Sequence, residues 1–429
     1  MTAPPPGGGW MTPRLLRNIQ AGGLYALLLL LPFSKASVEI LFGVLLLGWG
    51  LERSRKASRR QTIWLDPALR PLALAIGAYM TVCTLSVLGS DFRYLSLRGL
   101  IGKWLEYLMF LVIIADIARK PGVAQRSLWM LAGSSSAVAL YGLGQDAYVM
   151  WVRALKQAGA ITHYPAFIFQ RMTGPYENPV DLATYLMVAI PVLLGLALSQ
   201  RGRRRVGLFV LLGLLTLCVA RTASLGAWIG LWIGLLVMSC CSASARRWGL
   251  LLLLGSVVGG GLFLQGTGRL KPVMSFSETG KIDRVAMWQA ALNMIQDRPV
   301  LGHGVNTFMS NYLKYWVGGE RQPRYAHNCY LQVAAETGLV GLATFLVLLW
   351  QLFVNLIDGW RRRAPPDERL FLLGLIGGLL SFAVHAAVDT DFYSLRQAAL
   401  FWSLAGLAVG LAHPRRPRGM SRAMQSIAP

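Results

Sequence analysis

Histidines are the side chains of this sequence best suited to acid–base chemistry, because neutral imidazole is the usual general base near pH 7. The five histidines are His163, His303, His327, His385 and His413. No two have the spacing of metal ligands, and the sequence holds no HExxH, Walker or dinucleotide-binding motif. We therefore predict no metal site and no cofactor. We expect His163 to be solvated in a loop, His303 to be a loop residue, and His413 to mark the inner end of the last apolar stretch.

His327 is the strongest candidate for a general base. It stands just before a short helix that we predict to begin near Asn328. A histidine at that position faces the same pocket as the free N–H groups of the helix, and such a pocket attracts anions. A structural role fits the spacing of His327 equally well, so both interpretations stand at this point.

Arginines on the outer side of the chain are candidates for binding phosphate, because a guanidinium group stays charged and forms bidentate bonds with phosphate oxygens. Arg221 lies at the outer end of an apolar stretch, Arg284 opens a predicted helix, and Arg171 falls in an outer loop. Three arginines converging on one pocket would suit a diphosphate. Each alone is also compatible with an ordinary surface charge, and Arg221 with snorkelling to the interface.

Two acids near the end of the chain are candidates for pairing with these groups. Asp389 and Asp391 follow an apolar stretch, and His385 lies one helical turn before Asp389. We expect the acids either to pair with the arginines, to orient a histidine, or to form a solvated turn.

The elements that must position these residues are apolar helices. Of the 429 residues, 55% are hydrophobic and only 14% are charged. Stretches of about 17–25 apolar residues cross a bilayer core, and in lipid they must be helical because each backbone group needs an internal partner. We predict an all-α polytopic membrane protein with about twelve transmembrane helices, the first two forming a tight hairpin around Lys35. The spans are 16–33, 37–52, 69–89, 100–117, 127–145, 180–199, 206–221, 223–241, 248–265, 337–357, 370–388 and 396–412.

Basic residues cluster in short loops between these spans. The clusters lie in 53–68, 118–126, 200–205, 242–247 and 358–369 and in the C-terminal tail. Cytoplasmic loops carry such an excess of lysine and arginine, so we predict that these loops and both termini are cytoplasmic. The formal net charge of +23 therefore reflects membrane orientation, and we expect no nucleic-acid partner.

Two outer segments are long, 146–179 and 266–336. Loops of that length are usually functional or disordered. We expect 266–336 to fold into a large helical cap between spans nine and ten. In it, Val285, Trp288, Leu292 and Ile295 share one helix face, and the helix ends at Asp297-Arg298-Pro299. A second short helix runs from near Asn328 to Glu336 and breaks at Gly338.

The predicted domain organisation follows from these boundaries. It comprises a disordered cytoplasmic tail (1–15), spans one to nine with the outer loop 146–179 (16–265), the cap (266–336), spans ten to twelve (337–412) and a basic cytoplasmic tail (413–429). Four of the five cysteines lie in apolar runs and Cys329 is expected in an outer loop, so no disulfide framework is predicted. An outer site has no ATP supply, and the energy for any bond formed there must arrive with the substrate.

Several motifs in order resemble the O-antigen ligase and polymerase superfamily. They are DRVAMW at 283–288, PVLGHG at 299–304, HNCYLQ at 327–332, ETGLVG at 336–341 and RMTGPYENPVDLATYL at 171–186. The resemblance covers roughly residues 165–345. One motif departs from the family pattern: where the family often has Ser-Arg-Gly-Ala-Trp, this chain has Leu225 in place of the arginine. Arg221, four residues earlier and expected on the same helix face, is a candidate substitute.

The resemblance implies a bacterial inner-membrane glycosyltransferase with a periplasmic active site. The implied donor is a glycan on undecaprenyl diphosphate, and the implied acceptor is the lipid A–core oligosaccharide of lipopolysaccharide. Neither nucleotide nor metal is needed. His327 would be the base in a single displacement with inversion, and Arg284 and Arg221 would stabilise the leaving diphosphate. Arg171, Asn328, Tyr330 and Asp389 would bind substrate.

Three alternatives remain open at this point. Within the superfamily, the chain could be an O-antigen polymerase or a protein O-oligosaccharyltransferase, which share the donor and differ in the acceptor. A transporter would also have about twelve spans, although no internal repeat is evident. A structural membrane subunit would leave the outer arginines and the cap unexplained. The oligomeric state does not follow from the sequence.

Overall fold

The computed structural model describes residues 13–54, 62–160, 171–266, 279–318, 322–364 and 368–414, and within them it holds helices and no strand. The all-α class predicted from the sequence is confirmed. The helices are α1 (Pro13–Leu30), α2 (Lys35–Ser54), α4 (Arg70–Leu88), α5 (Arg93–Gly99), α6 (Glu106–Ala118), α7 (Val123–Gln157), α8 (Pro179–Ser199), α9 (Gly202–Thr222), α10 (Leu225–Cys241), α11 (Ala243–Gly266), α13 (Thr279–Asp297), α14 (Phe308–Tyr312), α15 (Cys329–Asp358), α16 (Arg369–His385) and α17 (Leu395–Ala412). Short 3₁₀ turns are η1 (Ile63–Leu65), η2 (Pro67–Leu69) and η5 (Asp391–Tyr393), and π-helical turns are η3 (Leu100–Leu105) and η4 (Gly359–Arg363).

Each of the predicted membrane spans falls on a helix. Five helical stretches in the described residues are long and apolar enough to cross a bilayer: Pro67–Leu88, Pro179–Ser199, Gly202–Thr222, Cys329–Arg362 and Leu395–Ala412. Two shorter apolar helices are Leu225–Cys241 and Arg369–His385. These lengths and compositions fit a multi-pass membrane protein. The full set of twelve spans stays a prediction.

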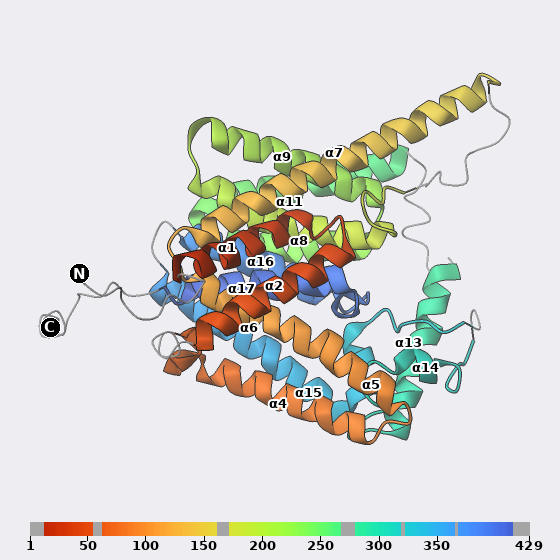
Figure 1. Ribbon diagram of the computed structural model, residues 1–429. Coiled ribbons are helices and arrows are strands. Elements are labelled where there is room, and N and C mark those ends of the chain that lie inside the picture. Colours follow the sequence, from red (N-terminus) through yellow and green to blue (C-terminus); the bar gives the residue numbers. More distant parts are fainter. Residues whose placement is uncertain are drawn as a thin grey trace, which may run out of the picture.

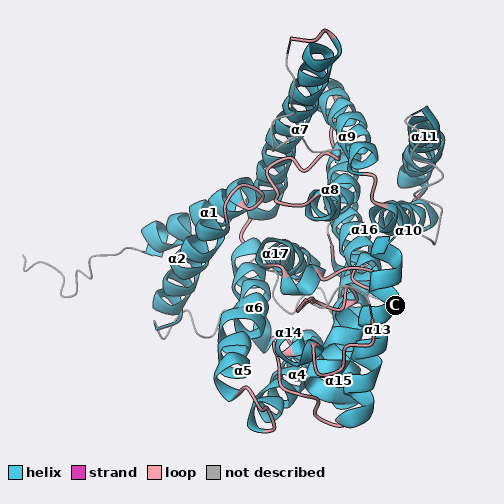
Figure 2. Cartoon of the chain, turned by 90° about the vertical axis from the view of Figure 1, so that its right-hand side faces the viewer, coloured by secondary structure: helices cyan, strands magenta, loops and turns pink. Residues whose placement is uncertain are grey.

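Two helices form the centre of the bundle. In the most apolar 18-residue stretch of each helix, 89% of the residues of α8 and 94% of those of α17 are buried inside the molecule. Figure 2 shows α17 lying between its neighbours. Small residues make this packing possible, as is usual where membrane helices approach closely. A Cβ at Gly410 of α17 would lie 2.5 Å from the Cβ of Ala118 in α6, and a Cβ at Gly195 of α8 would lie 2.3 Å from the carbonyl oxygen of Leu370 in α16.

The two ends of the bundle differ in their polar contacts. At one end, Arg119 donates to the carbonyl oxygen of His413 over 2.9 Å, and Arg53 pairs with Asp116 at 2.7 Å. At the other end, Arg396 donates to the carbonyl oxygens of Pro32 and Pro175 at 2.9 and 3.2 Å. The basic loops predicted to be cytoplasmic thus share the end opposite to Arg396. Which end faces which compartment stays a prediction.

The hairpin predicted at the start of the chain is present. Helices α1 and α2 are joined by residues 31–34 and lie side by side (Figure 1). Helix α7 differs from the prediction. It runs on to Gln157, so the outer loop predicted from residue 146 begins as a continuation of a helix. The apolar and small residues of 146–157 allow the helix to continue past the point where hydropathy falls.

The predicted cap contains α13, α14 and the start of α15, which gather at one end of the bundle in Figure 1. Helix α13 ends at Asp297, as predicted from the sequence Asp-Arg-Pro. Of the four residues predicted on one face, Ile295 packs against the cap interior, whereas Val285 and Leu292 are 61% and 41% exposed. The buried residues, which with their partners form the cap core, are Met287, Ala290, Ala291, Met294, Phe308, Tyr312, Ala326 and Ala335. Both sets of positions on α13 satisfy helical periodicity, and only the position of the partner helices decides between them.

The break predicted at Gly338 is present. Gly338 has φ 72° and ψ 178°, so α15 is two helical pieces joined at this residue. The segment 299–304 satisfies the backbone groups that the break exposes. Leu339 N–H donates to the Pro299 carbonyl over 2.7 Å, and Gly304 N–H donates to the Glu336 carbonyl over 2.8 Å. The first piece belongs to the cap and the second to the bundle.

Some predicted features lie outside the described residues. They are most of the tails at 1–15 and 413–429, His163, and the stretches 267–278 and 319–321 of the predicted cap.

Candidate functional site

His327 sits at the entrance to α15 in an unusual backbone conformation. Its φ is 46°, in the left-handed region that non-glycine residues seldom adopt. The next residue, Asn328, caps the helix: its side-chain oxygen accepts from the N–H groups of Tyr330 and Leu331, each at 3.0 Å. This geometry turns the imidazole of His327 away from the helix, toward Asp389. The His327 side chain remains 34% exposed.

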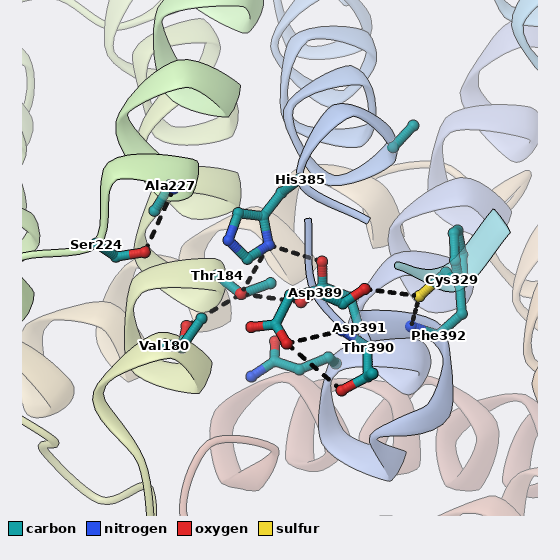
Figure 3. A network of polar contacts seen from close by, with 12 residues as sticks. Val180, Thr184, Ser224, Ala227, Cys329, His385, Asp389, Thr390, Asp391 and Phe392 are labelled. Carbon is teal, nitrogen blue, oxygen red and sulfur yellow. Dashed lines mark hydrogen bonds and ion pairs between the residues drawn. The ribbon is translucent and has the colours of Figure 1, made fainter. Parts of the chain in front are cut away.

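Asp389 is held by the loop between α16 and η5. Its Oδ1 lies 2.9 Å from Nδ1 of His327 and accepts from the N–H of Thr390 at 2.8 Å. Cys329 ties the start of α15 to the same loop, because its N–H donates to the Ala386 carbonyl and its thiol to the Asp389 carbonyl, over 2.8 and 3.2 Å. Figure 3 shows Cys329, Asp389 and Thr390 in this arrangement. The two halves of the pair therefore come from segments that are bonded together.

The electrostatics of Asp389 fix the tautomer of His327. Burial opposes ionisation of Asp389, yet the hydrogen bond with His327 and the nearby His385 hold its pKa below the ordinary value. An ionised carboxylate only accepts hydrogen bonds, so Nδ1 of His327 must carry the proton. Nε2 of the neutral ring then has the free lone pair. A half-exposed imidazole in this tautomer is equipped to take a proton from a hydroxyl group.

A second histidine–aspartate pair lies beside the first. Nδ1 of His385 is 2.7 Å from Oδ2 of Asp391, and Thr184 donates to Oδ1 of Asp391 over 3.0 Å (Figure 3). The side chains of His385 and Asp391 are 1% and 2% exposed. Gly226 closes the other side of the ring, since a Cβ there would lie 3.1 Å from Nε2 of His385. The solvated turn considered for Asp389 and Asp391 is wrong, because both acids are buried and each is paired with a histidine.

His385, Asp389 and Asp391 are also the described residues that come closest to a metal site. One donor atom from each lies within 4.8 Å of the others. Each of these side chains already has a hydrogen-bond partner in the protein: Asp391 and Thr184 for His385, His327 for Asp389, and His385 for Asp391. These contacts make two hydrogen-bonded histidine–aspartate pairs.

The contacts in the described residues do not bring all three predicted arginines together. Arg284 is half-buried in α13 and close enough to His385 for their charges to interact. Arg221 forms an ion pair with Asp146 of α7. Arg171 donates to the carbonyl oxygens of Thr222 and Ala223 at 2.6 and 3.3 Å, which places it beside Arg221.

The helix face expected to be shared by Arg221 and position 225 is absent, while the role of Arg221 as a substitute stays a prediction. Arg221 is in the last turn of α9, whereas Leu225 is the first residue of α10. Between them Ala223 adopts a left-handed conformation with φ 49°, so the two residues do not share a helix face. The spacing of four residues predicts a shared face only within one continuous helix.

The predicted substrate-binding residues Asn328 and Tyr330 also help to build the site. Asn328 is the helix cap described above, and the hydroxyl of Tyr330 donates to the Ala383 carbonyl over 2.6 Å. Cys329 is the buried first residue of α15, where the sequence predicted a helix to begin near Asn328.

The remaining described histidines lie elsewhere. His303 occupies the predicted turn, but its ring is 0% exposed, and burial lowers its pKa. Its Nε2 donates to the Met294 carbonyl at 3.1 Å, so it is part of the cap interior. His413 lies at the opposite end of the bundle, 3.1 Å from both Asp66 and Asn355.

Glu336 is a buried acid that the sequence analysis did not single out. Its carboxylate accepts from the N–H groups of Asn306 and Phe308 at 2.7 and 3.1 Å and from the hydroxyl of Tyr393 at 3.0 Å. It thereby joins the cap to the segment that follows Asp389. An acid placed directly before an apolar span was the available signal, because such residues are costly in a bundle unless they are satisfied.

The fold and this site define an all-α membrane protein with a half-open histidine–aspartate pair beside a buried one and a nearby arginine. Residues 182–346 match the family model for O-antigen ligase. The exopolysaccharide production protein ExoQ of Rhizobium meliloti (strain 1021) is 25% identical over 372 residues, which cover 80% of this chain and 78% of ExoQ. The resemblance seen in the motifs is therefore confirmed over residues 182–346. This kinship indicates glycosyltransferase activity of the ligase or polymerase type.

Proposed function

We propose that this protein transfers a glycan from undecaprenyl diphosphate to the lipid A–core oligosaccharide on the outer face of the bacterial inner membrane, completing lipopolysaccharide. The observation that carries the proposal is the half-exposed His327 held by Asp389 at 2.9 Å, within a domain matched to O-antigen ligase. This pair supplies a base where an acceptor hydroxyl can reach it.

The proposed reaction is a single displacement with inversion. The acceptor hydroxyl oxygen attacks the anomeric carbon of the donor while its proton passes to Nε2 of His327. The bond between the anomeric carbon and the diphosphate oxygen breaks, and its electron pair leaves with undecaprenyl diphosphate. Arg284 and Arg221 stabilise the charge that develops on that leaving group, as fixed cations do in water-poor sites. No nucleotide or metal enters these steps.

The proposed orientation places both termini in the cytoplasm and residues 266–336 in the periplasm. It rests on the basic loops that share one end of the bundle, opposite to His327 and Arg396. An alkaline phosphatase fusion at Gly318 should be active, because that enzyme folds only outside the cytoplasm, and a fusion at Arg203 should be inactive. Reversed activities would remove the outer-face site.

Purified protein in nanodiscs, incubated with an undecaprenyl-diphosphate glycan and lipid A–core, tests the proposed function directly. We expect a product that carries the glycan on the core, seen by mass spectrometry. The Gln289→Ala variant is a control in α13, because the Gln289 side chain is exposed and bonds to Asn293 of the same helix. Product in the control and none with His327→Ala would support the proposal. No transfer by the wild type to this acceptor would refute it.

The likeness to ExoQ favours a second candidate. Because a protein of exopolysaccharide production matches 80% of this chain, the acceptor could be a growing glycan chain, which would make the protein a polymerase with the same donor and base. Replacing lipid A–core by a second undecaprenyl-diphosphate glycan in the same assay separates the two. A ladder of longer lipid-linked chains would identify the polymerase.

A further inference from the structure

A cavity lined by both charged and apolar residues has no role in the reaction described above. Its volume is about 330 Å³, at the lower end of the range for small-molecule sites. It opens among α5, η3, the start of α2 and residues 306 and 393–395. The charged residues that line it are Arg98, Lys103 and Glu39, so cations outnumber carboxylates.

Neither cation forms a direct ion pair with a carboxylate in the described part of the chain. Arg98 is exposed and makes no ion pair or hydrogen bond there. Lys103 is half-buried, and its Nζ donates to the neutral Oδ1 of Asn306 over 2.7 Å. It also lies over the rings of Tyr325 and Tyr393, 5.8 and 5.7 Å from their centres. Glu336 is close enough to Lys103 for their charges to interact, but its carboxylate already accepts from the N–H groups of Asn306 and Phe308 and from Tyr393. With Arg98 beside it, Lys103 therefore retains attraction for a further anion.

The backbone that presents Lys103 is itself irregular. Lys103 lies in the π-helical turn η3, and such turns are frequent at functional sites. Gly99 precedes the turn and lets the next segment come close, because a Cβ there would lie 2.2 Å from the Cβ of Asn306. Asn306 has φ 62°, a left-handed conformation. Its N–H is fixed by Glu336 at 2.7 Å, so this wall of the cavity is set before any ligand arrives.

The cavity adjoins the histidine–aspartate pair along the chain on both sides. Tyr325 comes two residues before His327, and Tyr393 comes four residues after Asp389. The two tyrosine rings are 6.0 Å apart, and both lie under Lys103. The segments that carry the pair therefore also contact Lys103, which is why we consider a ligand that the two sites share.

We propose that this cavity is a substrate subsite for an anionic group, a phosphate or a carboxylate, carried by a glycan substrate. Arg98 and Lys103 bind the anion, and Glu39 accepts hydrogen bonds from sugar hydroxyls. The identification of the ligand as a glycan rests on the proposed function. The anion site itself does not depend on glycan transfer. Two sources have this chemistry: the diphosphate of the donor and an acidic sugar of the acceptor.

Isothermal titration of the purified protein tests the site without any need for activity. The probes are inorganic diphosphate and methyl glucuronide, and the protein carries Arg284→Ala so that diphosphate cannot report on the neighbouring site. In that background we expect at least one probe to bind, and Arg98→Gln to weaken it about tenfold, as loss of a charge-assisted hydrogen bond would. Arg93→Gln is the matched control, because Arg93 is an exposed arginine of the same helix that does not line the cavity. No binding of either probe, or equal weakening by both variants, would overturn the subsite.

Lys103 needs a folding control because it is half-buried. We expect Lys103→Met to abolish probe binding and Lys103→Arg to retain most of it, with both variants unfolding near the wild-type temperature. Equal loss in both, at normal stability, would contradict an anion site that depends on charge.

Kinetics then separates the two sources. If diphosphate is the natural anion, Arg98→Gln raises KM for the donor; if an acidic sugar is, it raises KM for the acceptor, and in both cases kcat changes little. A fall in kcat with both KM values unchanged would contradict a binding subsite. A wild-type protein that binds a probe but transfers no glycan would refute the proposed function and leave the anion site standing.

Discussion

The two histidine–aspartate pairs contain the same side chains at nearly the same separation, yet their surroundings differ. His327 and Asp389 are 2.9 Å apart, and the histidine is 34% exposed. His385 and Asp391 are 2.7 Å apart and 1–2% exposed. Proton transfer requires contact with the reacting group, so only the first pair can serve as an acid–base pair for a bulky substrate.

The buried pair has a different use. His385 closes α16, Asp391 opens η5, and Thr184 of α8 donates to Asp391 at 3.0 Å. The pair thus fixes the loop that carries Asp389. We interpret it as a structural element that stabilises this loop. Exposure, more than residue type or distance, separates the two roles.

The largest effect is expected at His327. His327→Ala should reduce transfer by about 10²–10⁴, the usual contribution of a general base, while expression and membrane insertion stay normal. Product formation by purified enzyme, measured as an initial rate at saturating substrate, checks this.

Asp389→Asn should also reduce the rate of transfer, because Asp389 holds the proposed base. It removes the carboxylate that holds the Nδ1 proton, and a hydrogen bond of this kind is worth about 1.5–3 kcal/mol, or roughly 10–150-fold in rate. Near-normal turnover in His327→Ala would make His327 structural and erase the difference between the pairs. His303 is unsuitable as a control histidine, because its ring lies inside the cap.

The next largest effects on the rate are expected from substitution of the arginines. Arg284→Ala should lower kcat by about 10²–10³, as expected when a fixed donor to a developing anion is lost, and Arg284→Lys should lower it less. The rate in single-turnover experiments measures this without product release. Arg221→Ala should have a smaller effect, because Asp146 already pairs with that charge. If Arg221→Ala is harmless, Arg221 is an interfacial anchor and leaves the mechanism.

Substitution in the buried pair should lower the stability of the protein and leave the rate of transfer nearly unchanged. Asp391→Asn leaves His385 with a weaker partner in a buried site, a change that typically costs about 3–5 kcal/mol. Thermal unfolding followed by tryptophan fluorescence should show a clear drop in midpoint. The folded fraction should keep kcat within about threefold. A normal midpoint with a kcat lowered a hundredfold would mean that His385 takes part in the chemistry.

The smallest expected effect is that of metal removal. Transfer should survive excess EDTA and need no added nucleotide, because fixed arginines neutralise the leaving group. Activity lost with EDTA and restored by magnesium or manganese would mean that His385, Asp389 and Asp391 share an ion. The two pairs would then be one metal centre, and the contrast between them would be withdrawn.

Local features of the sequence predicted the helices and their ends well. Hydropathy located α8, α9 and α17, and the Asp-Arg-Pro stop and the glycine break at 338 lie where they were expected. His327 was also singled out from local context, and its role as a base stays a prediction. These successes depend on neighbours in the chain, which periodicity and capping describe.

Pairings across the chain could not be predicted in the same way. His327 and Asp389 are 62 residues apart, and nothing local specifies which acid the histidine meets. The buried face of α13 depends on where α14 and α15 lie, and the left-handed Ala223 separates Arg221 from position 225. Lys103 was overlooked although it stands inside a predicted span, where a lone cation marks a site by default.

The break in α15 has a consequence for how this protein can vary. A Cβ on Gly338 would lie 2.0 Å from the carbonyl oxygen of Val300, and a Cβ on Gly302 would lie 2.5 Å from the carbonyl group of Glu336. Both collisions are with backbone atoms, so no change of a neighbouring side chain relieves them. Both glycines also have positive φ, at 72° and 66°. We expect neither position to accept even alanine, and no second-site substitution to rescue such a change. This contact therefore limits mutational drift in the cap more tightly than the residues of its apolar interior do, since those can exchange volume with one another.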